Sequence, residues 1–142
     1  MLLRKLLNAL IRITAISLLG AGMAQGATLT VKIEGIETIV GDIFVAVYKD
    51  AASYGSDDSL YSATVKVSRK TETVVFSEVP EGSYALKMYH DANENQELDT
   101  NFVGIPKEGY SFSNNGGRFG PPSFESASFD VSAATTISIV MK

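Results

Sequence analysis

The feature that most constrains this chain is a hydrophobic pattern that repeats every two residues. Leu29, Val31 and Ile33 alternate with polar residues, and this period puts the apolar side chains on one face of a strand. Between residues 43 and 48 apolar side chains occupy both parities, which is typical of a strand in the middle of a sheet. The pattern therefore predicts a β fold with at least one central strand.

Seven segments carry strand signals, and turns rich in Gly, Pro, Ser and Asp separate them. No amphipathic helical period follows residue 24, and the polar stretch at 50–59 predicts a surface loop. Short strands with frequent turn signals are typical of a two-sheet sandwich. We therefore expect an all-β, seven-stranded antiparallel immunoglobulin-like sandwich with one long ordered loop at 91–126. The predicted strands are 29–34, 43–48, 61–67, 73–79, 84–90, 126–131 and 135–141.

The first 24 residues have the features of a secretory signal peptide. Three basic residues precede an apolar run at 13–21, and Gly22 and Ala24 supply the small positions of a cleavage site. The run is too short to span a membrane, and no later stretch is longer. We expect residues 1–24 to be removed, with cleavage up to three residues later as the alternative, and residues 25–142 to form one soluble domain.

Composition limits the partners of that domain. Loss of the three basic residues in the first 24 changes the net charge from −4 to −7, and an acidic surface argues against nucleic acid or anionic lipid. The chain has no cysteine, which excludes disulfides, thiolate metal sites and a cysteine nucleophile. An exported protein without cysteine fits a bacterial periplasm or exterior. We expect a monomer with an unidentified envelope or extracellular partner.

The segment after the fifth predicted strand sets oxygen-bearing side chains at alternating positions, as calcium loops do. They are Asp91, Asn93, Asn95, Glu97 and Asp99. The match to an EF-hand is partial, because Gln96 replaces the glycine of position six and Phe102 replaces the glutamate of position twelve. No helical pattern flanks the segment. A weak calcium site is therefore one interpretation, with Glu97 or Glu108 folding back as a further ligand.

The other interpretation is that this loop is purely structural. Asp and Asn side chains readily accept hydrogen bonds from nearby backbone N–H groups and so stabilise turns. Five acidic residues lie between Asp91 and Glu108 against one lysine, a concentration that costs free energy unless water or a cation neutralises it. Both interpretations predict an ordered loop, and we expect His90, Glu108 and Asn114 to help organise it.

His90 is the only histidine, so any zinc site or acid–base pair would depend on it. It continues the apolar parity of Leu86 and Met88, which favours a partly buried ring that hydrogen-bonds the following loop. A hydrolase using His90 with Asp91 and a serine at 111 or 113 lacks a nucleophile-elbow motif. We therefore expect a protein that is not an enzyme.

The segment 104–124 suggests an alternative function, a binding module for a small molecule, a glycan or an envelope protein. Its glycines predict turns with positive φ angles, and its single arginine is Arg118. Four aromatic residues either pin the loop to the sheet or form an exposed ligand platform; pinning is the interpretation we favour. They are Tyr110, Phe112, Phe119 and Phe124.

Two long motifs resemble a known family. The stretch from Pro80-Glu-Gly-Ser-Tyr through His90-Asp-Ala-Asn-Glu-Asn to Asp99, and then Gly104-Ile-Pro-Lys-Glu-Gly-Tyr-Ser-Phe-Ser-Asn114, closely resembles the bacterial domain of unknown function 2141 family. The resemblance implies an exported single-domain β protein of a Gram-negative bacterium, with no established reaction. The sequence departs from the family motif at Gln96, where glycine is common. The Pro-x-Gly-x-Tyr turn is also similar to turns of transthyretin-like sandwiches, which gives an alternative topology.

Overall fold

The computed structural model describes residues 25–142, so the predicted signal peptide lies outside the described residues. The strands are β1 (Ala27–Glu34), β2 (Asp42–Tyr48), β3 (Tyr61–Lys66), β4 (Glu72–Val79), β5 (Gly82–Asp91), β6 (Tyr110–Phe112), β7 (Phe129–Val131) and β8 (Thr135–Val140). The helices are α1 (Ala51–Ser56), the 3-10 turn η1 (Ser113–Asn115) and α2 (Phe124–Ala127). None of these helices has the length and apolarity needed to cross a membrane.

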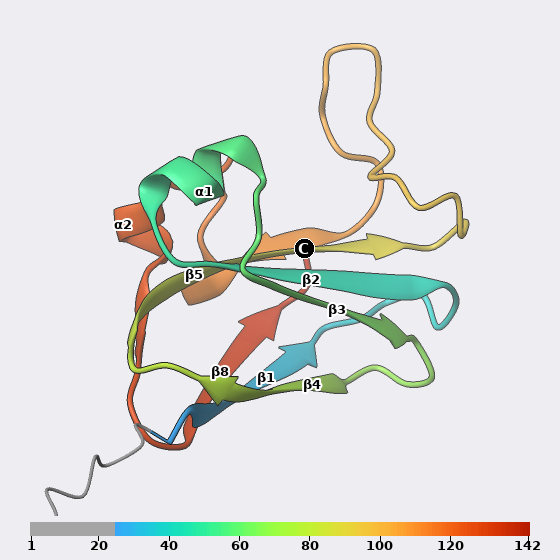
Figure 1. The fold of residues 1–142 in the computed structure, drawn as a ribbon. Helices are drawn as coiled ribbons and strands as arrows, with labels where there is room; N and C mark the ends of the chain where they lie inside the picture. The colour runs from blue at the N-terminus through green and yellow to red at the C-terminus, as the bar shows by residue number, and fades with distance from the viewer. Residues whose placement is uncertain (1–24) are drawn as a thin grey trace, which may run out of the picture.

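Two sheets pack face to face, as Figure 1 shows. One has the strand order β4-β1-β8, and the other has the order β3-β2-β5-β6 with β7 also paired to β5. The alternating residues of β1 and β2 point their apolar side chains between the sheets, where Leu29, Val31, Ile43 and Val45 are almost fully buried. The predicted all-β, two-sheet architecture is therefore confirmed, and β2 lies centrally between β3 and β5.

Three details of the prediction were wrong. The structure has eight strands, because Tyr110–Phe112 forms β6 inside the predicted long loop. Strands β1 and β8 pair in parallel, so the sandwich is not purely antiparallel. The predicted surface loop at 50–59 contains α1, which begins after Asp50, whose carboxylate accepts the Ser53 N–H at 2.8 Å. Each of these three features depends on a pairing partner that is distant in the sequence or on a capping hydrogen bond. A pattern read over a few neighbouring residues therefore does not reveal them.

A second, smaller cluster of buried residues lies on the outer face of the five-stranded sheet. Tyr54 of α1 and Ala127 of α2 pack there against the sheet residues Tyr48, Ala85 and Phe112. In Figure 1, α1 and the extended segment after β5 rise from this same outer face, away from the three-stranded sheet. The helices cover only one end of that face.

Candidate functional site

The outer face of the five-stranded sheet carries a row of side chains that crosses four strands. Thr64, Phe44, Tyr89 and Tyr110 lie opposite one another in successive pairs from β3 to β6. The rings of Phe44 and Tyr89 stack with centroids 5.0 Å apart and an interplanar angle of 17°. All three aromatic residues are half-buried, so each has ring surface left for another planar or apolar group.

A second row of side chains runs beside the first. It lies at the limit of the part of the sheet that the helices leave uncovered. It joins Ser62, Ala46, Lys87 and Phe112 in the same strand registers. Ala46 is the smallest side chain of the two rows, and it leaves a depression between larger neighbours. The two rows together form a floor that is mainly apolar and slightly hollowed.

Lys87 fastens α1 against this floor. Its Nζ donates to the Tyr54 carbonyl at 2.6 Å and to Asp57 Oδ1 at 2.5 Å. The same ammonium lies 4.3 Å from the ring centroid of Tyr54 and 5.0 Å from that of Tyr48, which is within the range of a cation–π contact. Burial raises the pKa of Tyr48 and of Tyr54 to about 12, and the Asp57 carboxylate adds to both shifts. Both phenols therefore stay neutral at physiological pH.

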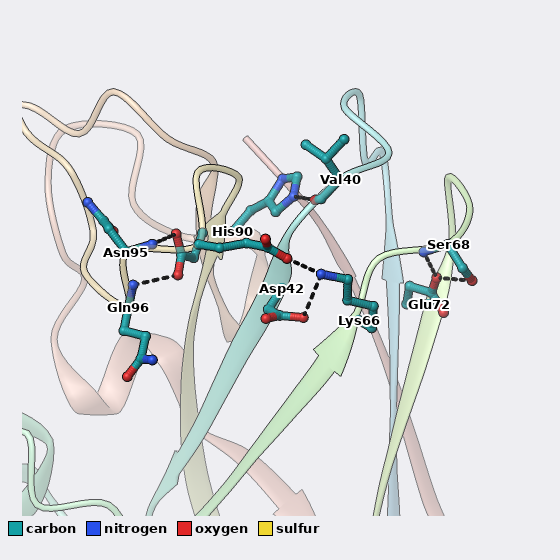
Figure 2. Close-up of polar contacts among 10 residues, drawn as sticks. Val40, Asp42, Lys66, Ser68, Glu72, His90, Asn95 and Gln96 are labelled. Atoms are coloured by element: carbon teal, nitrogen blue, oxygen red, sulfur yellow. Dashed lines mark hydrogen bonds and ion pairs between the residues drawn. The ribbon is translucent and has the colours of Figure 1, made fainter.

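The acidic loop, residues 91–99, begins at Asp91, whose carboxylate points into the protein interior. Asp91 is 1% exposed, and its two oxygens accept the backbone N–H groups of Asn95 at 3.1 Å and Gln96 at 2.7 Å (Figure 2). Gln96 has a φ of 67°, so it takes the left-handed conformation for which glycine is favoured. The loop therefore keeps its tight turn without the glycine.

The other polar residues of the acidic loop bind one another. The amide groups of Asn93 and Asn95 both donate to the Asp99 carboxylate. Their carbonyl oxygens accept backbone N–H groups two residues ahead, that of Asn95 at 3.2 Å and that of Glu97 at 3.0 Å. These are Asx turns, the pattern that the structural interpretation expects.

Glu108 ties both ends of the acidic loop to the strand that follows. Its Oε1 accepts the Ala92 N–H at 3.0 Å and its Oε2 accepts the Asp99 N–H at 3.0 Å. The hydroxyl of Tyr89 donates to the Gln96 carbonyl at 3.3 Å, which links the loop to the floor. Lys66 of β3 forms ion pairs with Glu94 and Asp42, as Figure 2 shows for Asp42.

The projecting loop, residues 100–106, continues from the acidic loop as a small hairpin. Thr100 and Pro106 form a bridge, and the Asn101 side chain accepts the N–H groups of Val103 and Ile105, each at 3.0 Å. Phe102 at the tip is 99% exposed. The base of this hairpin forms one wall of the site, while its tip points away.

Another wall comes from the Gly-rich loop, residues 116–121. Gly117 has a φ of 87°, and a Cβ there would lie 2.5 Å from the Phe112 ring, so only glycine lets the loop lie this close to β6. Asn114 holds the preceding turn, because its amide donates to the carbonyls of Ser126 and Ser128. Phe119 is 94% exposed, so the prediction that this ring pins the loop was wrong for Phe119.

The floor and these walls enclose a groove of about 1070 Å³, which we call the outer groove. Asp57 and Ser59 border it beside α1, Leu98 and Ile105 border it beside the projecting loop, and Arg118 borders it on the Gly-rich loop. Its volume is slightly above the range of about 300–1,000 Å³ that small-molecule sites usually occupy. The elements that meet here lie far apart in the sequence.

Comparison with known proteins places the chain in one family. A family model described as "Uncharacterized protein conserved in bacteria (DUF2141)" matches residues 31–138. The chain belongs to the DUF2141 family. No curated protein and no solved structure matches it significantly. The family resemblance seen in the motifs is thus confirmed, and the match includes the acidic loop and all walls of the outer groove.

In this DUF2141 chain the predicted calcium ligands lie close together but already have partners. The oxygens of Asp91 and Asp99 accept hydrogen bonds from within the loop. Glu97 is exposed, and both carboxylate oxygens of Glu108 accept backbone N–H groups. Within residues 25–142 no cluster of three or more His, Asp or Glu side chains has a metal-binding arrangement.

The histidine and the two serines of the hydrolase alternative form hydrogen bonds with backbone groups and not with one another. His90 is buried, and its Nε2 bonds the Val40 carbonyl at 2.6 Å, as Figure 2 shows. The ring therefore bonds the loop before β2, not the loop after β5 as we predicted. Ser111 Oγ donates to the Val140 carbonyl, and Ser113 Oγ accepts the Leu86 N–H and donates to the Ala127 carbonyl.

Sequence reasoning singled out only part of the floor of this DUF2141 site, namely Tyr110 and Phe112. The sequence pattern predicts Phe44, Ala46 and Tyr48 only as the second apolar face of a central strand, and it places Tyr89 with Ala85 and Lys87 on the parity opposite His90. The sequence did carry a signal for the floor, which is the second apolar face of the strand at 43–48. An apolar outer face needs either a covering element or a ligand. The chain lacks a helix long enough to cover that face within the described residues.

Proposed function

We propose that this protein is an exported, non-enzymatic binding protein that holds a small, mainly apolar molecule in the outer groove. The observation that carries the proposal is the groove itself, a hollow of about 1070 Å³ whose floor is a row of half-buried aromatic rings. Sites for small molecules are usually concave, lined with apolar and aromatic side chains, and supplied with few polar groups. The outer groove has these properties.

Rigidity of the walls supports a binding role. Lys87 fixes α1, Glu108 fixes the acidic loop, and Asn101 fixes the hairpin of the projecting loop. A site whose walls are ordered before the ligand arrives loses less conformational entropy on binding. This arrangement favours specific binding over the role of a spacer between other domains.

The titratable groups near the groove support a non-enzymatic role. Lys87 and Asp57 bind each other, and the neutral phenols of Tyr48 and Tyr54 have pKa values raised to about 12. General acid–base catalysis works best with groups whose pKa lies near the working pH. His90 and the two buried serines have backbone partners instead of one another.

We further propose that the acidic loop is structural and that its function is to hold the projecting loop beside the groove. Its carboxylates stabilise Asx turns and backbone N–H groups, and Glu108 closes it. Export rests on the basic and apolar pattern of residues 1–24 and on the absence of cysteine. Within this proposal the protein is a monomeric immunoglobulin-like or transthyretin-like sandwich that acts in the envelope or outside the cell.

The test is a titration with N-phenyl-1-naphthylamine, a neutral aromatic dye whose fluorescence rises in apolar surroundings. We expect saturable binding at one site. Phe44→Ala removes part of the floor and Phe119→Ala part of a wall, and each should weaken binding about fivefold. Phe102→Ala is the matched control, because Phe102 is as exposed as Phe119 but lies outside the groove. Near-UV circular dichroism checks that each variant is folded. Absence of saturable binding to the unmutated protein would overturn the proposal.

A further inference from the structure

Arg118 is one of the two basic residues that line the outer groove. Its guanidinium lies 5.2 Å from the ring centroid of Phe119, the neighbouring exposed aromatic residue. Lys87, the other basic residue that lines the groove, forms an ion pair with Asp57, whereas in residues 25–142 no carboxylate lies within ion-pair distance of Arg118. A guanidinium has five N–H donors, and those of Arg118 are available at the rim of the groove.

The charge of the groove differs from that of the whole protein. The described domain has more acidic than basic residues, yet Asp57 is the one carboxylate among the residues that border the groove. Lys87 neutralises Asp57 through the contact at 2.5 Å. Among the lining residues, the charge without an ion-pair partner is therefore the positive charge of Arg118. Burial raises the pKa of Tyr89, and the carboxylates of Asp91, Glu108 and Glu97 add to that shift, so negative charge also acts on the floor from the side of the acidic loop.

The shape and chemistry of the floor limit what lies on it. The stacked rings of Phe44 and Tyr89 continue to Tyr110 in the next strand. Because Phe44 and Tyr89 stack on each other, a ligand above them meets ring edges, and edge-to-face contact with these edges favours a flat aromatic ligand. An uncharged sugar would bring several hydroxyl groups, and the side chains that line the groove offer them hydroxyls, such as those of Ser62 and Thr64, but no free carboxylate, Asn or Gln. Each unpaired hydroxyl would lose a hydrogen bond to water.

We propose that the outer groove binds a small organic acid with a flat, mainly aromatic body. The body lies on the row formed by Phe44, Tyr89 and Tyr110, and the acidic group pairs with the guanidinium of Arg118. This inference rests on the proposed function, since it names the ligand class for the same groove. Arginine suits the role because its planar fork matches a carboxylate or sulfonate through two parallel hydrogen bonds.

The test compares two dyes that differ by one anionic group. The compound 8-anilinonaphthalene-1-sulfonate has the aromatic skeleton of N-phenyl-1-naphthylamine and carries a sulfonate in addition. We expect the anionic dye to bind more tightly to the purified protein and to displace the neutral one. Arg118→Gln should weaken the anionic dye about three- to tenfold and leave the neutral dye unchanged. Added salt should weaken only the anionic dye.

Arg69→Gln is the matched control, because it removes the same charge from the β3–β4 turn, outside the groove. Both variants are surface changes, and a thermal melt verifies that they are folded. If both dyes bind equally and Arg118→Gln affects neither, the acid-binding inference is overturned while the binding function stands. If neither dye binds, the proposed function fails as well.

Discussion

The Oε2 atom of Glu108 accepts the backbone N–H of Asp99 at 3.0 Å, so a residue next to β6 fixes a loop that leaves β5. The second oxygen of the same carboxylate accepts the Ala92 N–H. One side chain thereby closes the acidic loop at both ends. The wall of the outer groove depends on this closure, because the projecting loop continues directly from Asp99.

Glu108→Gln should destabilise the protein and weaken dye binding. An amide offers one acceptor oxygen, so the N–H of Ala92 or of Asp99 would face an NH₂ group, at a cost of about 1–3 kcal/mol. Urea unfolding measures the stability, and hydrogen exchange should show faster exchange of the amides of Ala92 and Asp99. Glu97→Gln is the control, since Glu97 is exposed on the same loop. Equal stability of the two variants would contradict the bridging role.

Calcium at millimolar concentration should leave the melting temperature unchanged. The oxygens of Asp91 and Asp99 already accept hydrogen bonds inside the loop, so a cation would have to replace these contacts. A ligand of the folded state at ten times its Kd would add about 1.4 kcal/mol to the unfolding free energy. A saturable rise with calcium that magnesium does not reproduce, and that Asp91→Asn abolishes, would instead establish a calcium site.

Tyr54→Phe should leave stability unchanged or raise it by up to about 1 kcal/mol. The Tyr54 hydroxyl is buried without a hydrogen-bond partner, and removing an unsatisfied polar atom is favourable. The matched variant is Tyr84→Phe, because the Tyr84 hydroxyl donates to the Pro80 carbonyl at 2.8 Å. That variant should lose about 1 kcal/mol. Chemical denaturation of the two variants measures their unfolding free energies. If Tyr54→Phe loses more stability than Tyr84→Phe, the Tyr54 hydroxyl has a hydrogen-bond partner.

Glu72 should make stability depend on acid pH. The backbone N–H of Ser68 holds the pKa of this buried carboxyl below its ordinary value of 4.5, and the hydroxyl of Ser68 and the N–H of Arg69 act in the same direction. A lowered folded-state pKa gives stability that is present above the unfolded pKa and is lost as the pH falls through the folded pKa. Glu72→Gln should therefore cost about 1–3 kcal/mol at pH 7, and the difference should shrink below pH 4.5.

Urea titrations of Glu72→Gln and the unmutated protein at pH 7 and at pH 3 measure this difference. Glu81→Gln, an exposed change in the β4–β5 turn, is the control for the loss of one negative charge. A difference that stays constant over this pH range would show that the hydrogen bonds of Glu72 do not depend on its charge.

The regular part of the fold could be predicted because its cause is local. The alternation of Leu29, Val31 and Ile33 is enough to make one face of β1 apolar, and burial of that face drives the packing of the two sheets. The same reasoning identified β2 as central. Strand β6 was not predicted, because three residues are too few to show a period. Its pairing partner, β5, also lies more than twenty residues earlier in the chain.

The site could be predicted only in part. Arg118 and Phe119 were recognised within a candidate binding segment, and the acidic loop and Glu108 were recognised as an ordered unit. The direction of the His90 ring toward Val40 could not be foreseen, since a hydrogen bond across about fifty residues depends on how the sheets pack. The part played by Phe44 and Tyr89 in the floor was missed for the same reason, whereas Tyr110 and Phe112 were named from the sequence.

By itself, the sequence determined a cysteine-free β domain with an ordered Asp- and Asn-rich loop, because strand periodicity and Asx turns are local properties of the chain. Only the tertiary structure decided that Phe44, Tyr89 and Tyr110 form one row. It also decided that Arg118 has no acidic partner beside them. Strand register joins residues that lie far apart in the chain, and the groove exists only where that register places them.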